Sequence, residues 1–212
     1  FERFAGRCGV ERDRNSCVLW FCSEENVWKL CEFVREERTA PLEELLVVFI
    51  SNENRTVPLW KQRSAHGDQP VIWDYHVILL QVGVQSEPLV YDLDSELSFP
   101  CRLQLYAHQA LRSDRGIKPA YHRKLRVVPA DSFLLNFASD RSHMRNPDGS
   151  WKMPPPLYPP IHTAECHMNL DDFISMSPAV GWGQVFSGAM FIPKNVQFPG
   201  IKTPSVSKQC RA

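Results

Sequence analysis

Strand-sized apolar segments follow one another through the middle of this chain, and their length limits the folds that it can adopt. Residues 45–50, 56–60, 71–82 and 89–93 are rich in β-branched or aromatic side chains, and Asn, Gly, Asp and Pro separate them. We expect these segments to be strands of one mostly antiparallel sheet. The longest apolar runs fall far short of the roughly 20 residues that cross a bilayer, so we expect no membrane partner.

A helix is predicted immediately before these strands. Val27, Leu30, Cys31 and Val34 recur at helical spacing between residues 24 and 38, and charged residues occupy the opposite face. Ser23 precedes two acidic residues, so its side-chain oxygen is suited to cap the first turn. We therefore expect the helix to begin near residue 23.

The second half of the chain predicts shorter elements. Residues 102–111 suit a second helix, 125–128 another strand, and 131–137 a short helix capped by Asp131. Residues 146–160 hold three consecutive prolines and are predicted to form a long loop. Neither the helical nor the strand period continues beyond Phe186, so we expect the last 25 or so residues to be poorly ordered. Because helices and strands are segregated, the pattern favours an α+β fold.

Composition narrows the class of protein. A chain of 212 residues suits one domain. Lysine plus arginine and aspartate plus glutamate number 24 each, so no net charge attracts nucleic acid. The seven cysteines include no Cys-x-x-Cys pair, which argues against a disulfide framework or a zinc knuckle. We expect reduced thiols and a monomer of the cytoplasm, with the nucleus as a further location.

Three residues together suggest a catalytic triad. Cys22 lies at the predicted helix amino terminus, where the helix dipole and a nearby imidazolium lower the pKa of a thiol. His76 lies in the long strand, on the face shared by Ile78 and Leu80, and Asp92 lies in the next strand. A hairpin-like pairing would bring Asp92 to the imidazole and orient it. The alternatives are a buried apolar cysteine, a satisfied core histidine and an aspartate that forms a turn.

Two further groups of polar residues contain potential ligands or catalysts, and neither is predicted to be a functional site. His162, Cys166 and His167 are soft metal ligands, but they have no second pair at finger-like spacing, so we predict no metal site. Residues 140–143 are charged, and we expect them to be solvated or hydrogen-bonded rather than catalytic.

Several longer segments resemble one known family. They are residues 24–32 (EENVWKLCE), 48–53 (VFISNE), 71–76 (VIWDYH), 91–94 (YDLD), 129–132 (PADS), 137–144 (FASDRSHM) and 169–174 (NLDDFI). On these segments, residues 24–186 resemble the protein N-terminal glutamine amidohydrolase family. Residues 1–23 and 187–212 depart from it, and we interpret them as poorly ordered segments produced by splicing or gene modelling.

The resemblance implies a fold and a reaction. The fold is an α-β-α sandwich of the papain-like and transglutaminase-like cysteine hydrolases, and the family needs no metal or organic cofactor. Its members convert an amino-terminal glutamine of a protein or peptide into glutamate through a thioester, and they act in the N-degron pathway. The resemblance places the histidine base on His76 and its orienting carboxylate on Asp92.

The nucleophile position departs from the family pattern. The family has a cysteine immediately before Glu-Glu-Asn, whereas this chain has Ser23 there and Cys22 one residue earlier. A serine hydroxyl is a much poorer nucleophile than a thiolate. The attacking thiol is therefore either Cys22 or missing, and a catalytically silent module that binds amino termini is the alternative function. A thiol protease or a transglutaminase-like acyltransferase is a third interpretation.

An enzyme for terminal glutamine must also recognise a free α-ammonium group. A buried carboxylate is suited to this task. Asp74 and Glu25 are the candidates, because both lie close in sequence to the proposed triad. Their alternative roles are a surface salt bridge and a charge at the helix amino terminus.

Overall fold

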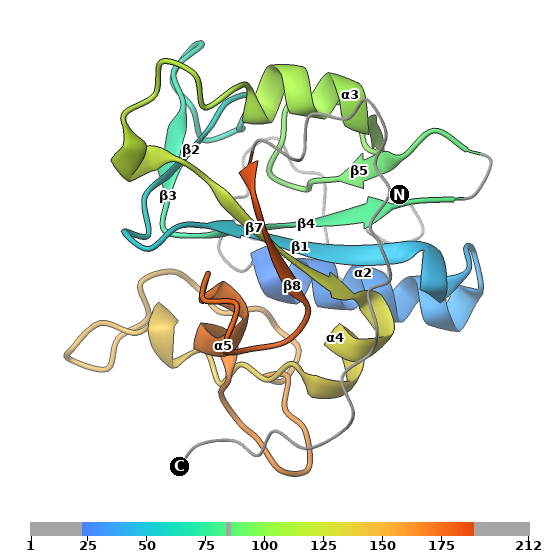
Figure 1. The fold of residues 1–212 in the computed structure, drawn as a ribbon. Helices are drawn as coiled ribbons and strands as arrows, with labels where there is room; N and C mark the ends of the chain where they lie inside the picture. The colour runs from blue at the N-terminus through green and yellow to red at the C-terminus, as the bar shows by residue number, and fades with distance from the viewer. Residues whose placement is uncertain (1–22, 84–85, 189–212) are drawn as a thin grey trace.

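The computed structural model of the protein describes residues 23–83 and 86–188 (Figure 1). Its helices and turns of helix are α2 (Ser23–Glu37), η1 (Leu42–Glu44), α3 (Leu103–Tyr106), η2 (Ala107–Leu111), η3 (Pro119–Tyr121), α4 (Ala130–Asn136), η4 (Ser142–Met144) and α5 (Leu170–Ile174). Its strands are β1 (Leu45–Ser51), β2 (Val57–Leu59), β3 (Val71–Trp73), β4 (His76–Gln81), β5 (Leu89–Tyr91), β6 (Cys101–Arg102), β7 (Lys124–Pro129) and β8 (Gln184–Ser187).

Six strands form one antiparallel sheet in the order β6-β5-β4-β1-β7-β8. All seven residues of β1 are buried, as are five of the six in β4, so the centre of the sheet is covered on both faces. This explains why these strands read as continuous apolar runs rather than as alternating ones. The predicted α+β fold with a mostly antiparallel sheet is confirmed.

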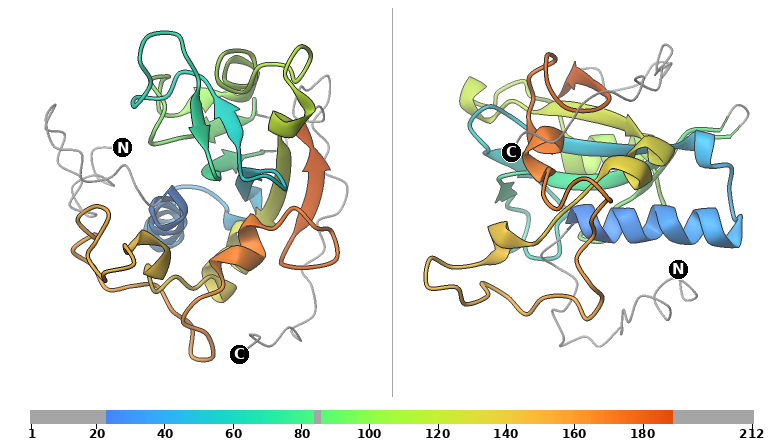
Figure 2. Two further views of the ribbon diagram at one scale, coloured as in Figure 1. Left: turned by 90° about the vertical axis from the view of Figure 1, so that its left-hand side faces the viewer. Right: turned by 90° about the horizontal axis from the view of Figure 1, so that it is seen from below.

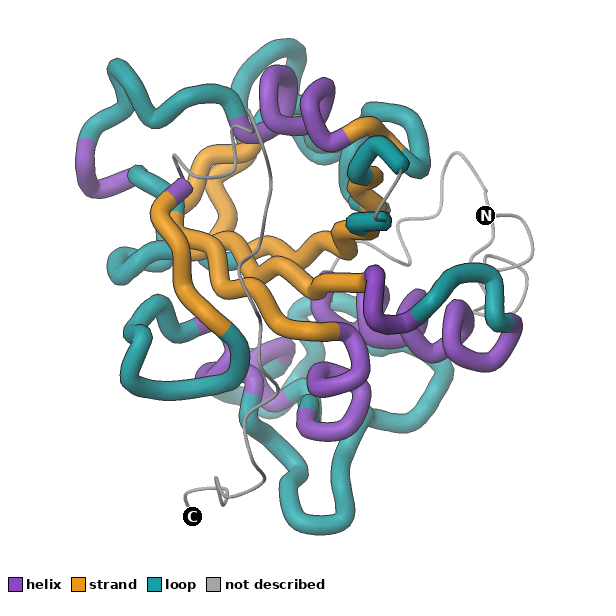
Figure 3. The backbone as a smooth tube through the Cα atoms, turned by 45° about the vertical axis from the view of Figure 1, so that its right-hand side comes forward, coloured by secondary structure: helices purple, strands orange, loops and turns teal. Residues whose placement is uncertain are grey.

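Alternate residues of the central strands feed two separate hydrophobic clusters. Val77 and Leu79 belong to the cluster that packs against α2, α4 and α5. Ile78 and Leu80 belong to the cluster that packs against β2 and α3. Figure 1 shows α2, α4 and α5 on one side of the sheet and α3 on the other, and Figure 3 shows the strands between helical segments. The sandwich is therefore layered as expected.

The helix α2 follows its prediction closely. It begins at Ser23, and its buried apolar residues are Val27, Leu30, Cys31 and Val34. Its opposite side is covered by the loop that follows α4, where Lys29 lies 5.0 Å from the ring of Tyr158. In Figure 2 this helix is seen end-on, between the sheet and that loop. Both sides of α2 are thus in contact with the rest of the domain.

The segment predicted as one strand, residues 71–82, is divided into two. The side chain of Asp74 accepts a hydrogen bond from the backbone N–H of Tyr75, at 2.9 Å. Because this local bond replaces a ladder bond, the strand ends and the chain changes direction. β3 pairs with β2 in a separate two-stranded sheet, while β4 joins the main sheet. The prediction of a single sheet was wrong at this point.

Two smaller predictions were also wrong. The cap of α4 is Pro129 without a side-chain hydrogen bond, and Asp131 lies inside the helix, where it accepts from the N–H of Ser132 at 2.6 Å. The strand β8 was not predicted, and it pairs with β7 at the edge of the sheet. The segment before β8 is held by Arg126, whose guanidinium donates to the carbonyls of Ser175 at 2.8 Å and Trp182 at 2.7 Å. Residues 189–212, like residues 1–22, lie outside the described part of the chain, so their expected disorder stays a prediction. The same prediction included Ser23 and Ser187 and was wrong there, because these residues lie in α2 and β8.

Two further predictions concern the loops and the cysteines. Residues 146–160 contain neither helix nor strand, as their prolines indicated. Cys31 and Cys101 are free thiols, but Cys166 is disulfide-bonded, so the prediction of reduced thiols was wrong at that residue. None of the helices formed by the described residues combines the length and apolar character that spanning a bilayer requires.

Candidate active site

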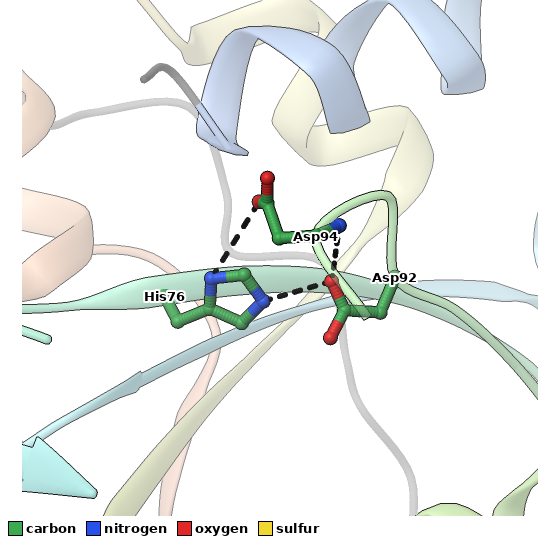
Figure 4. Close-up of side chains that lie close together, drawn as sticks. All are labelled: His76, Asp92 and Asp94. Carbon is green, nitrogen blue, oxygen red and sulfur yellow. Dashed lines mark hydrogen bonds and ion pairs between the residues drawn. The ribbon is translucent and has the colours of Figure 1, made fainter. Parts of the chain in front are cut away.

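His76 and Asp92 meet at one end of the main sheet. His76 is the first residue of β4, and Asp92 directly follows β5, the neighbouring strand. The imidazole Nε2 lies 3.0 Å from Asp92 Oδ1, and both side chains are buried (Figure 4). The hairpin-like pairing inferred from the sequence is therefore confirmed as a contact between these two side chains.

The carboxylate of Asp92 is held by four donors. Oδ1 faces His76 and also accepts from the backbone N–H of Asp94 at 2.9 Å. Oδ2 accepts from the hydroxyl of Tyr106 at 2.7 Å and from the amide of Gln62 at 3.4 Å. Since a carboxylate offers about four acceptor sites, Asp92 is saturated and its orientation is fixed.

Burial and neighbouring charges act in opposite directions on the two pKa values. Burial by itself would raise the pKa of Asp92, but the charge of His76 and hydrogen bonds from His76 and Tyr106 lower it below its usual value. Burial would likewise lower the pKa of His76, but the charges of Asp92, Asp94 and Glu24 raise it. An ionised Asp92 therefore accepts the Nε2 proton.

The other imidazole nitrogen, Nδ1, is left for chemistry. It makes no hydrogen bond with the part of the chain that the structure describes, and the side chain of His76 is completely buried. Its nearest charged neighbour is Asp94, whose Oδ2 lies 3.9 Å away (Figure 4). With the proton fixed on Nε2, Nδ1 carries the lone pair that can accept a proton from a nucleophile.

Packing and burial distinguish Asp94 and Trp73 from ordinary core residues. Burial, with the charge of Asp92, raises the pKa of Asp94 to about 7. The ring of Trp73 stacks on the imidazole of His76 at 5.2 Å between centroids, which fixes the plane of the imidazole. The indole N–H of Trp73 has no hydrogen-bond partner among the described residues.

The amino terminus of α2 lies at the same end of the sheet. Glu24, in the first turn of α2, accepts a hydrogen bond from the hydroxyl of Tyr75 at 2.9 Å, and Tyr75 directly precedes His76. The charge of Glu24 contributes to the raised pKa values of both His76 and Asp94. The nucleophile position of the sequence motif, Ser23, is the first residue of this helix, whereas Cys22 lies outside the described residues.

The two residues expected to recognise an α-ammonium group have different surroundings. Asp74 is exposed, and its Oδ1 accepts from the N–H of Tyr75. Glu25 is fully buried, and its carboxylate receives Arg141 at 2.9, 3.2 and 2.7 Å. A bidentate arginine already neutralises Glu25, so it has little capacity left for a substrate ammonium. Both assignments stay predictions.

Most of the residues that surround this site carry no distinctive signal in the sequence. Tyr75, Gln62, Tyr106, Arg141 and His143 all contact acidic side chains at this end of the domain. Their partners are distant in sequence, with Arg141 and Glu25 separated by 116 positions. Only the charged tetrad 140–143 gave a signal, and the expectation that it is hydrogen-bonded is confirmed for Arg141.

A metal site is an alternative interpretation of the side chains at this position. His76, Asp92 and Asp94 are the group of potential ligands found among residues 23–83 and 86–188, with ligand atoms within 4.8 Å of one another. However, Nε2 of His76 and Oδ1 of Asp92 already contact each other, and the carboxylate of Asp92 is saturated by donors. These contacts suit an imidazole that a carboxylate orients better than they suit two ligands of a shared metal ion. The three soft ligands at residues 162–167 do not form a second such site, since Cys166 is disulfide-bonded.

This chain is similar to a known family and to several named proteins. The model of the N-terminal glutamine amidase family matches residues 18–194, a range wider than the segments that carry the resemblance. A protein of Danio rerio named protein N-terminal glutamine amidohydrolase is 57% identical over 179 residues, which are 84% of this chain and 89% of the relative. Proteins of the same name in Homo sapiens and Drosophila melanogaster are 52% and 48% identical, over 84% and 88% of this chain and 87% and 91% of their own lengths. The chain therefore belongs to the N-terminal glutamine amidase family.

Proposed function

We propose that this chain hydrolyses the side-chain amide of an amino-terminal glutamine, so that ammonia leaves and glutamate remains. The single observation that carries the proposal is the buried 3.0 Å contact between His76 Nε2 and Asp92 Oδ1 beside the start of α2. The names of the relatives from three animals support the same substrate. A protein or peptide that begins with glutamine is thus the substrate.

His76 acts as the proton carrier in this proposal. Its Nδ1 takes the proton of the attacking group, and the bond from Nε2 to Asp92 stabilises the imidazolium that results. The nucleophile then forms a bond to the amide carbon, and the imidazolium gives its proton to the departing nitrogen. Water attacks the acyl-enzyme, His76 accepts a proton from it, and the nucleophile is released with the glutamate.

The nucleophile of this chain differs from the family pattern. The attacking atom we propose is the sulfur of Cys22, which makes the intermediate a thioester. Cys22 directly precedes α2, where a helix amino terminus favours a thiolate. Ser23 occupies the position of the family's cysteine, and its hydroxyl is a weaker nucleophile.

A mass-spectrometric assay tests this proposal. A peptide that begins with glutamine is incubated with the chain, and replacement of the amide by an acid is followed over time. Cys22→Ser should abolish the conversion and Ser23→Ala should leave it nearly unchanged, because Cys22 supplies the thiolate. Faster labelling of Cys22 than of Cys31 or Cys101 by an electrophile would support thiolate character. Conversion that survives Cys22→Ser would reject Cys22 as the nucleophile.

Serine at the first residue of α2 favours one second candidate, a catalytically silent module that binds amino termini. This module would bind the glutamine peptide without converting it, and Ser23→Cys would restore hydrolysis. Cleavage of the peptide, or incorporation of an amine, would instead indicate a thiol protease or a transglutaminase-like acyltransferase. The products of the incubation therefore distinguish the three alternatives: an acid, no conversion, or cleavage and amine incorporation.

The cellular setting is proposed from the resemblance and from the composition of the chain. We propose a monomer of the cytoplasm, with the nucleus as a further location, that acts in the glutamine branch of the N-degron pathway and requires no cofactor. The zero net charge supports the absence of nucleic acid among its partners. Light scattering of the purified chain and fractionation of cells would test the oligomeric state and the location.

A further inference from the structure

Glu24 is a buried carboxylate whose hydrogen bonding is incomplete. Its side chain is fully buried, and Oε2 accepts from the hydroxyl of Tyr75 at 2.9 Å. Oε1 has no hydrogen-bond partner among the described residues, although Nε2 of His143 lies 3.4 Å away. A buried charged oxygen without a donor keeps the full desolvation penalty of that group. An unsatisfied buried group of this kind needs an explanation, and a bound ligand that donates to Oε1 would provide one.

The neighbouring residue shows that this incompleteness is local. Glu25 is equally buried, yet the Arg141 guanidinium contacts both of its oxygens. The chain supplies a guanidinium to Glu25, whereas the cationic group that faces Glu24 is the imidazole of His143, whose Nε2 lies 3.4 Å from Oε1. This contact is longer than the 2.7 Å contact between Arg141 and Glu25, so a substrate ammonium can take the place of the imidazole beside Oε1.

The position of Glu24 suits a group next to the reacting amide. Glu24 is the second residue of α2, and its hydrogen-bond partner Tyr75 directly precedes His76, so the carboxylate lies close to the proposed base. In a glutamine residue the α-nitrogen and the amide carbon are at most about 5 Å apart, given standard bond lengths of about 1.5 Å. The group that binds the α-ammonium must therefore lie within one side chain of the attacked carbon.

We propose that Glu24 binds the α-ammonium group of the substrate's terminal glutamine, and that this contact excludes internal and blocked glutamines. The inference rests on the proposed function and deepens it, since it names the group that selects a free amino terminus. An ammonium supplies charge-assisted hydrogen bonds to Oε1, whereas a peptide or acetylated nitrogen is neutral and bulkier. A neutral substrate leaves the buried charge unpaired, which is a strong basis for rejection.

His143 covers the carboxylate in the absence of substrate. Its side chain is 24% exposed, and its Nε2 lies 3.4 Å from Oε1 of Glu24, a distance that makes an ion pair but not a well-aligned hydrogen bond. Burial by itself would lower the pKa of His143, but the contact with Glu24 raises it, so an incoming ammonium would replace the imidazole as the cation beside Glu24. Asp74, the exposed candidate, keeps Oδ1 on the N–H of Tyr75 and has no such buried oxygen to satisfy.

Two peptides that differ in one group test this assignment. The first begins with glutamine, and the second begins with the glutaramoyl analogue, in which hydrogen replaces the α-amino group. Binding is measured by fluorescence anisotropy and conversion by mass spectrometry. The natural chain should prefer the glutamine peptide by about 10- to 100-fold, the value of a charged hydrogen bond. Glu24→Gln should remove this preference by weakening the glutamine peptide, mainly in Kd or KM, while the analogue is unaffected.

Further variants make the result specific. Glu24→Asp keeps the charge on a shorter side chain and should retain part of the preference, which covers the case that Glu24→Gln folds poorly. Tyr75→Phe removes the donor to Oε2 and should weaken the preference by a few-fold. Glu32→Gln, on the same helix and paired with Lys29 at 2.8 Å, is the matched control and should change nothing.

The outcomes separate the two proposals. A full preference in both Glu24 variants, with thermal melting that shows folded protein, would overturn the role of Glu24 alone. Equal treatment of both peptides by the natural chain would do the same. A natural chain that neither binds nor converts either peptide would remove the proposed function, and the role of Glu24 with it.

Discussion

Two buried ion pairs lie near the first turn of α2, and they differ in how completely they are satisfied. In the first pair, Arg141 contacts both oxygens of Glu25 and donates its remaining N–H groups to backbone carbonyls, that of Tyr158 among them at 3.0 Å. In the second pair, His76 is bonded to Asp92 through Nε2 only, and its Nδ1 has no hydrogen bond with the described residues.

A completely bonded pair stabilises the fold, whereas an incompletely bonded pair keeps atoms available for a substrate. A complete buried network fixes two segments against each other, here α2 and the loop after α4, and it leaves nothing for a ligand. An incomplete network carries a free-energy cost that a ligand can remove. Glu24, Trp73, His76 and His143 each carry a buried atom without a hydrogen bond to the described residues. Trp73 stacks on His76, and His143 faces Glu24 in the first turn of α2, which is where the substrate is proposed to bind.

The largest expected effect comes from removing His76, the histidine of the incompletely bonded pair. His76→Ala removes the proton carrier, so conversion of the glutamine peptide should fall by about 100- to 10,000-fold. Initial rates measured by mass spectrometry give the result. His122→Ala, an exposed histidine bonded to the carbonyl of Ile117, should leave the rate unchanged. Full activity in His76→Ala would show that the imidazole is not the base.

Breaking the complete pair should act on stability instead. Arg141→Met leaves the charge of Glu25 buried without a partner, and the free energy of unfolding should fall by about 3–5 kcal/mol. Urea denaturation followed by circular dichroism measures this. The double variant Glu25→Leu with Arg141→Met should recover much of the loss, because no buried charge remains. A double variant as unstable as the single one would contradict this account.

A pH series sharpens the comparison through Asp94. Burial raises the pKa of Asp94 from 3.8 to about 7, so the folded state holds its proton more tightly than the unfolded state does. Its contribution to stability is fully present below pH 3.8 and is lost as the pH rises through about 7. Between pH 5 and 8 the natural chain should therefore lose stability relative to Asp94→Asn, and the difference in the free energy of unfolding should change by on the order of 2 kcal/mol.

Thermal unfolding at several pH values checks this prediction for Asp94. Glu165→Gln, at an exposed position, is the control and should leave the pH dependence unchanged. If Asp94→Asn and the natural chain lose stability in parallel, the carboxyl of Asp94 does not hold the extra proton.

The smallest expected effect concerns the support of Asp92. Tyr106→Phe removes one of four donors to Asp92, at 2.7 Å from Oδ2, and should cost about 1 kcal/mol of stability. Conversion should fall only a few-fold, because His76, Asp94 and Gln62 still hold the carboxylate. Calorimetry and initial rates measure the two effects. A loss of activity as large as that of His76→Ala would mean that Tyr106 itself touches the substrate.

Local patterns in the sequence predicted the frame of this domain. The three-then-four spacing of Val27, Leu30 and Val34 gave α2 to within one residue, because a helical stripe must be apolar wherever it is buried. The apolar run around Val77 gave β4, since a strand covered on both faces has no polar side. Alternation and the pairing of β4 with β5 then placed His76 and Asp92 on one face.

Features that depend on contacts between distant segments escaped prediction. The break at Asp74 follows from a side-chain bond to the next N–H, which composition does not distinguish from a strand residue. The edge strand β8 is partly exposed and carries no period, and it is placed by pairing with β7 and by the Arg126 contacts that precede it.

Local patterns in the sequence thus predicted most of the elements, because periodicity and the adjacency of consecutive strands are local properties. The family resemblance assigned catalytic roles to His76 and Asp92, whose side chains the structure places 3.0 Å apart. Tertiary structure alone decided which of two consecutive glutamates is neutralised. Arg141 reaches Glu25 from 116 residues away, and His143 of the same segment reaches Glu24 without completing its hydrogen bonds. Satisfaction of a buried charge depends on the arrangement of all surrounding segments, and no single segment of sequence specifies it.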